Sequence, residues 1–458
     1  MENMIPLNGR IAIVDDQIEQ ALPLMRVFAK NNIPYVYYKG TDIDFLPEQP
    51  ENDIRILLLD LNLLSGRDNQ PKDIRSSLFS VLSHIISPNN YPYVLVLWSR
   101  QEKDYKEMLE ELFSNDLKGC APIAILEWIK SEFFPNFSDE EVNKDEEYKI
   151  IDKLKNVIAE LPAYSYLMQW ENCVHNSADE TIQDIFHDYQ SQENWKNSTN
   201  CILDMFAKSY LEKHYKDSSI EKRAKASLFF LNDVFYDTLE STITNSRIDN
   251  SVELHYETNS DLTSDIRSKV NSFLLLSKTQ TQINQPGCIF TSSDRNVECV
   301  KQLKALLNDS LDTDDIRAQV SEQFHDICTK EARDLYNYQI KERRDAILST
   351  AMPCGVVVTP ACDYAQNKAK YDRIVLGIII DSCYKVFIDK KSEAIYVSPS
   401  FDESLHERLL VLNYRYFLTQ NLSKTNGIEV LYRIRNSVLS EIQSKLARHI
   451  NRQGVMTL

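Results

Sequence analysis

The feature that most constrains the fold is the alternation of short apolar runs with amphipathic stretches along the first 135 residues. Several apolar runs are continuous Val, Ile and Leu segments, which is typical of parallel strands that are covered on both faces. Helical patterns at 17–31, 74–86 and 103–113 separate them. This alternation predicts a doubly wound parallel α/β sheet. The expected strands are 11–15, 35–38, 55–60, 93–99 and 122–126.

One crossover in this region departs from the pattern. Residues 40–53 contain two prolines and little helical periodicity, so we expect a short helix or none there. The rest of the chain divides into a mainly helical stretch, 139–284, and a C-terminal α/β module, 285–458, that ends in a helix at 429–450. With the N-terminal sheet placed at 1–138, the chain is predicted to be an α/β protein of three domains.

Acidic residues stand where two of the expected strands end. Asp15 and Asp16 close the first strand, and Asp60 closes the third. In the flavodoxin-like strand order these two strands are neighbours, and functional groups gather at the carboxyl ends of the strands. The sequence therefore predicts that three carboxylates converge at one edge of the sheet.

Three neighbouring carboxylates need a counter-charge, because each one raises the pKa of the others. A hard divalent cation such as Mg²⁺ provides it, since it binds carboxylates, backbone carbonyls and water. We expect a magnesium site at this edge.

Two further polar residues are expected at the same edge. Ser99 ends the fourth strand, and Lys130 follows the fifth strand if that strand continues to residue 129. Lys118 is a rival for the role of Lys130, although it precedes the strand. A hydroxyl and an ammonium would supply the hydrogen bond and the charge that a phosphoryl group on Asp60 requires.

These residues, in this order, resemble the receiver domain of response regulators over about residues 8–137. The resemblance implies that Asp60 accepts a phosphoryl group, with Ser99 as the switch hydroxyl and Lys130 as the family's lysine. It also implies that Mg²⁺ is held by Asp15, Asp16, Asp60 and the backbone carbonyl of Asn62. The sequence departs from the family at Ser131, where a proline is usual, and at the aromatic switch position, which falls on Glu127 or Trp128.

The same resemblance implies a two-component function. The phosphoryl donor would be a sensor histidine kinase, and the receiver would relay or buffer the signal to a downstream effector protein. A long receiver protein with no evident DNA-binding helix-turn-helix is similar to the receiver components of bacterial antiphage (Detocs-like) systems. A homodimer is also compatible with this organisation. Two alternatives stay open: a scaffold that works without phosphorylation, and an effector enzyme gated by the receiver.

Composition narrows the possible partners and the compartment. A net charge of −17 argues against general binding to nucleic acid or to anionic membranes. The nine cysteines are scattered without a C-x-x-C pair, which favours reduced thiols over disulfides. Neither a signal peptide nor an apolar run of membrane length is evident. We therefore expect a cytoplasmic protein.

Three weaker signals have structural explanations that compete with functional ones. Cys362 and Asp363 follow an apolar strand and could form a ligand site or a nucleophile, or simply a buried cysteine beside a turn. Trp170, in a helical pattern with apolar neighbours, is expected in a core. The basic residues of the terminal helix could bind an acidic partner or offset the helix dipole; they are Arg433, Arg435, Lys445, Arg448 and Arg452.

Overall fold

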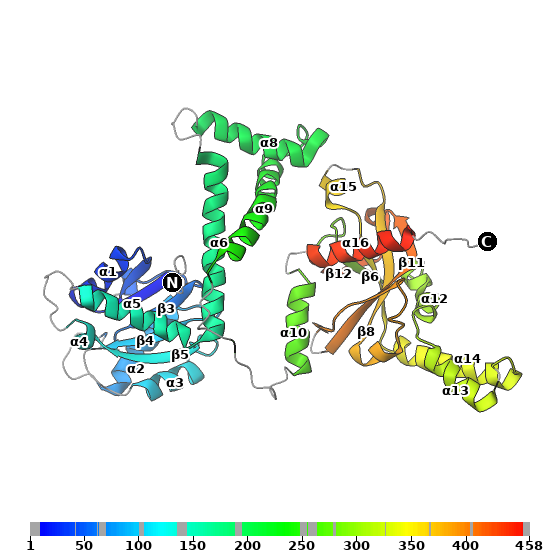
Figure 1. The fold of residues 1–458 in the computed structure, drawn as a ribbon, viewed down its shortest axis with the longest axis horizontal. Helices are drawn as coiled ribbons and strands as arrows, with labels where there is room; N and C mark the ends of the chain where they lie inside the picture. Colours follow the sequence, from blue (N-terminus) through cyan, green and yellow to red (C-terminus); the bar gives the residue numbers. More distant parts are fainter. Residues whose placement is uncertain are drawn as a thin grey trace. The chain divides into compact units, whose positions relative to one another are not determined.

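The computed structural model forms two compact units, each with one β-sheet (Figure 1). The first unit combines Met1–Asn200 with Leu228–Tyr256, and the second combines Cys201–Ser227 with Glu257–Leu458. The structure describes residues 10–451 except 42, 62, 64–69, 100–104, 135–143, 188–194, 248–253, 255–262, 278–280, 326, 366–367 and 404–405.

The sheet of the first unit has five parallel strands in the order β2-β1-β3-β4-β5. This is the flavodoxin-like order, and it confirms the predicted doubly wound α/β fold. The strands are β1 (Arg10–Asp15), β2 (Tyr35–Lys39), β3 (Ile54–Leu59), β4 (Val94–Ser99) and β5 (Ala124–Ile129). Apart from the solvent-exposed Arg10, β1 is buried along its whole length, as expected for a strand with helices on both sides.

Helices cover both faces of this sheet. One face packs on α2 (Pro71–Ile85) and α3 (Lys106–Asn115), and the other on α1 (Ile18–Lys30). The crossover after β2 contains only the short 3₁₀ helix η1 (Ile43–Phe45) among its described residues, in line with the weak helical periodicity of that segment.

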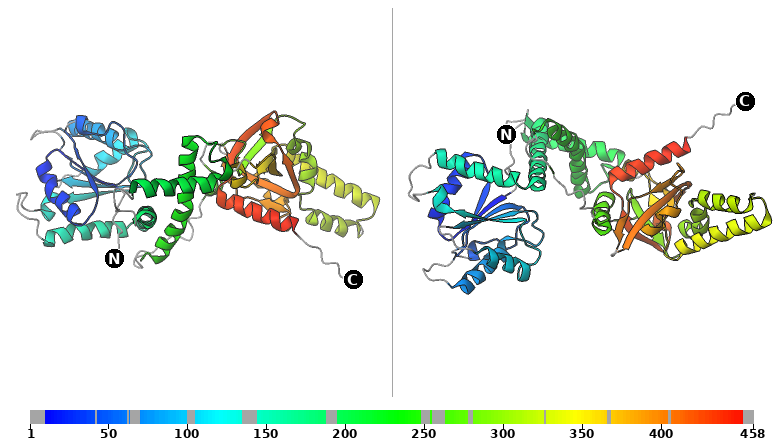
Figure 2. Two further views of the ribbon diagram at one scale, coloured as in Figure 1. Left: turned by 90° about the horizontal axis from the view of Figure 1, so that it is seen from above. Right: turned by 60° about the horizontal axis from the view of Figure 1, so that its bottom comes forward.

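The core on the α1 face is completed by residues beyond the predicted boundary at 138. The short helix α4 (Lys130–Phe133) follows β5, and α5 (Lys144–Ala159) then packs beside α1 (Figure 2). Its side chains Ile150 and Leu154 are buried in the same cluster as strand residues of the sheet. A chain cut at residue 138 would therefore expose this face.

The helical middle continues with α6 (Pro162–Phe186), a single helix of 25 residues. Its N-terminal part contacts the start of β3. The Tyr164 hydroxyl donates to the Arg55 carbonyl oxygen at 2.7 Å, and the Arg55 guanidinium pairs with Glu171 at 2.8 Å. The placement of Trp170 in a core is wrong, because this side chain is 55% exposed.

The middle region continues with a series of further helical segments. They are η3 (Trp195–Thr199), α8 (Asn200–Leu211), η4 (Glu212–His214), α9 (Ile220–Asn245) and α10 (Ser264–Leu275). The chain passes between the two compact units three times: after Asn200 at the start of α8, after Ser227 within α9, and after Tyr256.

The second unit is built on a seven-stranded antiparallel sheet, which confirms an α/β C-terminal module. Its order is β10-β11-β8-β7-β6-β12, with β9 also paired to β11. The strands are β6 (Cys288–Ser292), β7 (Met352–Val357), β8 (Asp372–Asp381), β9 (Ile395–Val397), β10 (Phe401–Glu403), β11 (His406–Gln420) and β12 (Ile428–Arg433).

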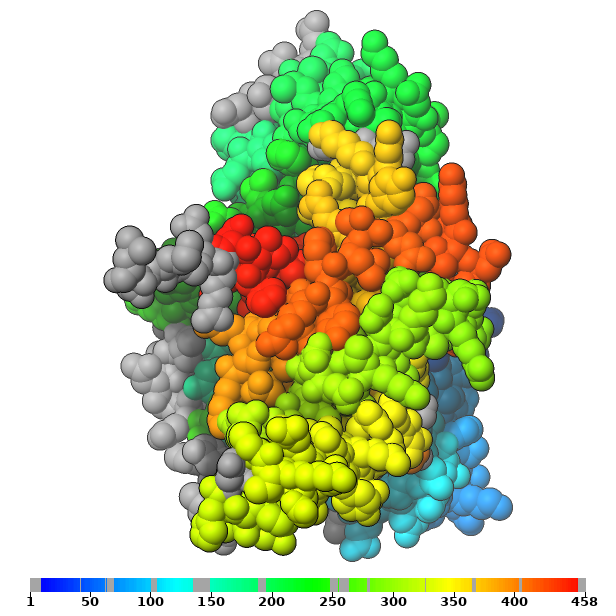
Figure 3. Space-filling view, turned by 90° about the vertical axis from the view of Figure 1, so that its right-hand side faces the viewer, coloured from blue at the N-terminus to red at the C-terminus, as the bar shows by residue number. Residues whose placement is uncertain are grey.

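Helices lie on both faces of this second sheet. They are α11 (Glu298–Lys301), α12 (Leu303–Asn308), α13 (Asp314–Phe324), α14 (Lys330–Leu348), α15 (Ala361–Ala365) and α16 (Asn436–Ile450), with the 3₁₀ segments η5 (Ser382–Phe387) and η6 (Leu422–Lys424). One face of the sheet packs on α16 and α10, and the other on α11, α12 and the end of α14. Figure 3 shows α13 and α14 in yellow-green and yellow on the surface of this unit.

One element prediction for this module is wrong. The terminal helix starts at Asn436 and not at 429, because residues 428–433 form β12, which pairs with β6. The segment 384–388 lies mainly in the 3₁₀ helix η5. In the part of the chain that the structure describes, no helix is both long and apolar enough to cross a membrane.

Candidate functional site

The site lies at the carboxyl edge of the first sheet, where β1 and β3 end side by side. Asp15 is the last residue of β1, Asp16 follows it, and Asp60 directly follows β3. One carboxylate oxygen from each of the three lies within 4.8 Å of the others. The predicted convergence of the three acids is therefore present.

Hydrogen bonds to the backbone and side chain fix Asp15 and Asp60 at the strand ends. The Gln17 amide N–H donates to Asp15 Oδ1 at 2.9 Å, and the Tyr37 hydroxyl donates to the Asp15 carbonyl oxygen at 3.1 Å. The Asp60 amide N–H donates to the Val14 carbonyl oxygen at 2.8 Å, which continues the β1–β3 ladder. The two carboxylates are thus placed by the strand register.

Lys130 is the cation of the site. It immediately follows β5, which runs to Ile129 as the placement of Lys130 required. Its side chain is completely buried, and Nζ donates to Asp15 Oδ2 at 2.6 Å and to Asp60 Oδ2 at 3.0 Å. A third donation goes to Gln20 Oε1 at 3.2 Å. All three ammonium protons thus have an acceptor.

Ser99, Lys118 and Asn62 are the other residues that the sequence suggested for this site. Ser99 ends β4, opposite Ile129 in the ladder, so it shares the edge that carries Asp60 and Lys130. Lys118 is exposed in the turn before β5, away from this edge. Asn62 lies outside the described residues.

Sequence reasoning missed Gln17 and Gln20. Gln20 is 5% exposed and accepts from Lys130, while its own Nε2 donates to Gln17 Oε1. The sequence does contain an indication of this role. Gln20 stands one residue before the buried Ala21, near the start of a helix whose buried side otherwise carries apolar side chains. A buried amide there needs polar partners.

Burial dominates the electrostatics of the cluster. It raises the pKa of Asp15 to about 6; the Lys130 ammonium opposes this rise and the Asp60 carboxylate adds to it. Burial also raises the pKa of the half-buried Asp16. Three carboxylates face one ammonium, so the cluster keeps excess negative charge when all groups are ionised.

This excess charge and the oxygen donors fit a hard divalent cation. Carboxylate oxygens are the ligands such cations prefer, and Asp15, Asp16 and Asp60 offer them within a few ångströms. The side chain of Asp16 is the most open of the three, which leaves room for water on the metal. The described residues therefore form a candidate metal site.

An aromatic cluster lies at the ends of β4 and β5 and in the short helix that begins at Lys130. Trp98 and Trp128 sit on the adjacent strands β4 and β5 with ring centroids 6.5 Å apart, and Phe133 and Phe134 pack on Trp98 at 5.6 and 6.2 Å. Both tryptophans are at most 3% exposed. Trp128 is thus packed in the core and not poised to rotate between solvent and interior.

The weaker candidates lie in the second unit. Cys362 is exposed on α15, so its interpretation as a buried cysteine is wrong, and Asp363 pairs with Arg373 at 3.3 Å. In the basic C-terminal segment, Arg433 Nε donates to the Pro286 carbonyl oxygen at 3.1 Å. The Cys362 thiol also donates to Asp363 Oδ1 at 3.9 Å.

No protein-family profile, curated protein or solved structure matches this chain. Any functional assignment therefore depends on the geometry of the acidic site.

Proposed function

We propose that this protein is a receiver-type phospho-acceptor, in which Asp60 takes a phosphoryl group from a sensor histidine kinase. The observation that carries the proposal is Lys130. Its buried ammonium bridges Asp15 and Asp60 at the carboxyl edge of a 2-1-3-4-5 parallel sheet. A lysine is costly to bury, and this one is held against the carboxylate that would be phosphorylated.

The proposed step is a simple group transfer. The Asp60 carboxylate attacks phosphorus, the P–N bond of the donor phosphohistidine breaks, and an acyl phosphate forms on Asp60. Lys130 would pair with a phosphoryl oxygen, and the Ser99 hydroxyl would donate to another. Water can later cleave the acyl phosphate and restore Asp60. Such transfers depend mainly on positioning and on charge neutralisation.

Mg²⁺ is the metal we propose for the site. Asp15, Asp16 and Asp60 would hold it, and it would neutralise the charge that develops on the phosphoryl oxygens. The carboxylates of Asp15 and Asp16 would then be held ionised, against the burial that raises their pKa. The phosphorylated state would be read by a downstream effector protein in a signalling pathway, for which bacterial stress or antiphage defence is the setting we favour.

Acetyl phosphate with Mg²⁺ tests the proposal on the full chain. We expect the intact mass to increase by one phosphoryl group, and the adduct to be lost in base. Asp60→Asn should abolish the adduct, because an amide does not form an acyl phosphate; Asp16→Asn should slow its formation. An adduct of equal yield on Asp60→Asn would refute the assignment of Asp60. Mg²⁺ binding without any adduct would favour the scaffold that works without phosphorylation.

A further inference from the structure

Two glutamines at the start of α1 connect the ammonium of the acidic site with one of its carboxylates. Gln17 is the N-cap residue of α1, and Gln20 lies in the first turn. Residues three apart on a helix are neighbours on one face, so both side chains can reach the same edge of the sheet. Because Gln20 is only 5% exposed, its amide depends on partners inside the protein.

The hydrogen bonds of these glutamines form an unbroken path. Lys130 Nζ donates to Gln20 Oε1 at 3.2 Å, and Gln20 Nε2 donates to Gln17 Oε1. Gln17 Nε2 in turn donates to Asp16 Oδ2 at 3.3 Å. We call Lys130, Gln20, Gln17 and Asp16 the glutamine relay. The relay joins the lysine to the most open of the three acids without passing through either of the other two carboxylates.

The two ends of the glutamine relay fix the direction of every bond in it. An ammonium can only donate hydrogen bonds, and an ionised carboxylate can only accept them. Gln17 therefore presents its amide N–H to Asp16 and its oxygen to Gln20. Gln20 must then present its own oxygen to Lys130. Bonds that all run in one direction polarise and strengthen one another, so the Gln20 oxygen is held as an acceptor for the lysine.

The proposed reaction changes the other two described acceptors of Lys130 but not Gln20. Those two acceptors are Asp15 at 2.6 Å and Asp60 at 3.0 Å. Asp15 would share its oxygens with Mg²⁺, and Asp60 would become the acyl phosphate. Gln20 belongs neither to the proposed metal ligands nor to the phosphorylated residue, so its contact with the lysine can persist throughout the transfer.

We propose that Gln20 is a positioning residue, which holds the Lys130 ammonium in place while its contact with Asp60 is exchanged for one with the phosphoryl group. A lysine side chain is flexible and has many rotamers, so a contact that does not change restricts where Nζ can lie. Phosphoryl transfer depends strongly on such positioning. This inference rests on the proposed function, because it concerns how Lys130 meets the phosphoryl group.

The neutral charge of Gln20 suits this role. A carboxylate at position 20 would be a further counter-ion for Lys130 and would compete with the phosphoryl group for it. An apolar side chain would leave one ammonium proton without its acceptor in the interior, which is costly. An amide accepts from the ammonium without neutralising it, so the positive charge stays available to the phosphoryl oxygens.

Two measurements on Gln20→Met test the proposal on the full chain. Methionine fills a similar volume, but its sulfur is only a weak acceptor. With saturating Mg²⁺, the rate at which acetyl phosphate labels Asp60 should fall about tenfold, which is the rate equivalent of one hydrogen bond to a charged group. The Mg²⁺ dissociation constant, measured by calorimetry, should stay within about twofold of the wild-type value, because no proposed metal ligand is removed.

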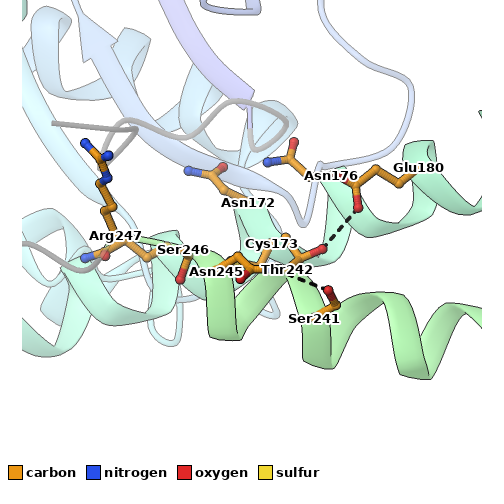
Figure 4. A pocket seen from close by; sticks show the side chains of 10 residues that line it. Asn172, Cys173, Asn176, Glu180, Ser241, Thr242, Asn245, Ser246 and Arg247 are labelled. Atoms are coloured by element: carbon orange, nitrogen blue, oxygen red, sulfur yellow. Dashed lines mark hydrogen bonds between the residues drawn. The ribbon is translucent and has the colours of Figure 1, made fainter.

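Gln169→Met is the matched control, because it makes the same chemical change in the same unit. Gln169 also has a hydrogen bond, from Nε2 to Ser165 Oγ at 3.1 Å. It lines a polar cavity formed by α6 and the end of α9 (Figure 4). The helix α6 contacts β3 at the opposite end of that strand from Asp60. The control should therefore alter neither the labelling rate nor the affinity for Mg²⁺.

The possible failures can be told apart. Equal labelling rates for the wild type and Gln20→Met would overturn this inference and leave the phospho-acceptor proposal standing. Equal slowing by Gln169→Met, or a Mg²⁺ dissociation constant that rises in step with the loss of rate, would also overturn it, because a distorted site would then explain the change. A wild type that gains no adduct would remove the phospho-acceptor proposal and this inference with it.

A second variant covers the case in which Gln20→Met does not fold, which circular dichroism checks. Gln17→Ala keeps Gln20 but removes the group that fixes the direction of its amide. Labelling of Asp60 should then slow about threefold, since the acceptor remains but is less firmly oriented. Labelling of this variant at the wild-type rate would overturn the inference.

Discussion

The raised pKa of Asp15 predicts how the stability of the first unit depends on pH. In the folded state this pKa is about 6, against an ordinary value of 3.8, chiefly because the side chain is completely buried. Between these two values the folded state holds a proton that the unfolded state has released. The free energy of unfolding contributed by Asp15 is therefore greatest below pH ~4 and falls as the pH rises to ~6.

The size of the effect follows from the pKa difference. A gap from 3.8 to about 6 corresponds to about 3 kcal/mol at about 1.4 kcal/mol per pH unit. Asp15→Asn removes the ionisable group but keeps an oxygen that can accept from Lys130, and Lys130 keeps Asp60 as its counter-ion. At pH 7.5 and without divalent cations, the variant should be more stable than the wild type by up to about 3 kcal/mol.

Urea unfolding followed by tryptophan fluorescence measures this difference. All four tryptophans lie in the first unit (Trp98, Trp128, Trp170 and Trp195), so the signal of the full chain reports this unit alone. The stability of Asp15→Asn minus that of the wild type should be close to zero near pH 4 and increase to a plateau above pH ~7. A difference that decreases with pH would mean that Lys130 outweighs burial, and would refute the reasoning.

The same fluorescence assay tests three further predictions. Mg²⁺ should stabilise the wild type by about 2.7 kcal/mol when its concentration is 100 times its dissociation constant. Asp16→Ala should weaken the affinity of the protein for Mg²⁺ at least about tenfold, because the most open ligand is lost. If Mg²⁺ does not shift the unfolding midpoint of the wild type, the metal site is contradicted. Lys130→Ala should destabilise the unit by about 3–5 kcal/mol, because it leaves Asp15 and Asp60 buried without their cation. Lys118→Ala, at an exposed turn, should change stability by no more than about 0.5 kcal/mol, and equal losses in the two lysine variants would contradict the placement of Lys130. Tyr164→Phe should cost about 1 kcal/mol through the lost hydrogen bond to the Arg55 carbonyl, and an unchanged stability would show that this bond does not anchor α6.

The acidic site was predictable from sequence because its residues stand at strand ends. A buried parallel strand is visible as a continuous apolar run, and the residue that follows it must lie at the carboxyl edge. This reasoning located Asp15, Asp60 and Lys130. It did not locate Gln20, because an amide on an amphipathic helix is usually solvated and only the tertiary structure shows that this one meets Lys130.

The failures of prediction are mostly long-range pairings. The strand β12 pairs with β6, more than a hundred residues earlier in the chain, and neither segment has a local pattern strong enough to reveal it. The exposure of Trp170 was missed for a related reason. A helical stripe in sequence predicts an apolar face, but it does not say whether the chain itself or another molecule covers that face.

Mapping the phosphorylated residue tests the central claim most directly. After reaction with acetyl phosphate and Mg²⁺, borohydride reduces an aspartyl phosphate to homoserine, and peptide mass spectrometry locates the modified residue. We expect homoserine at position 60, in the peptide that follows β3, and unmodified aspartate at positions 15 and 16. Homoserine at any other aspartate, or none anywhere in a folded protein that binds Mg²⁺, would contradict the account.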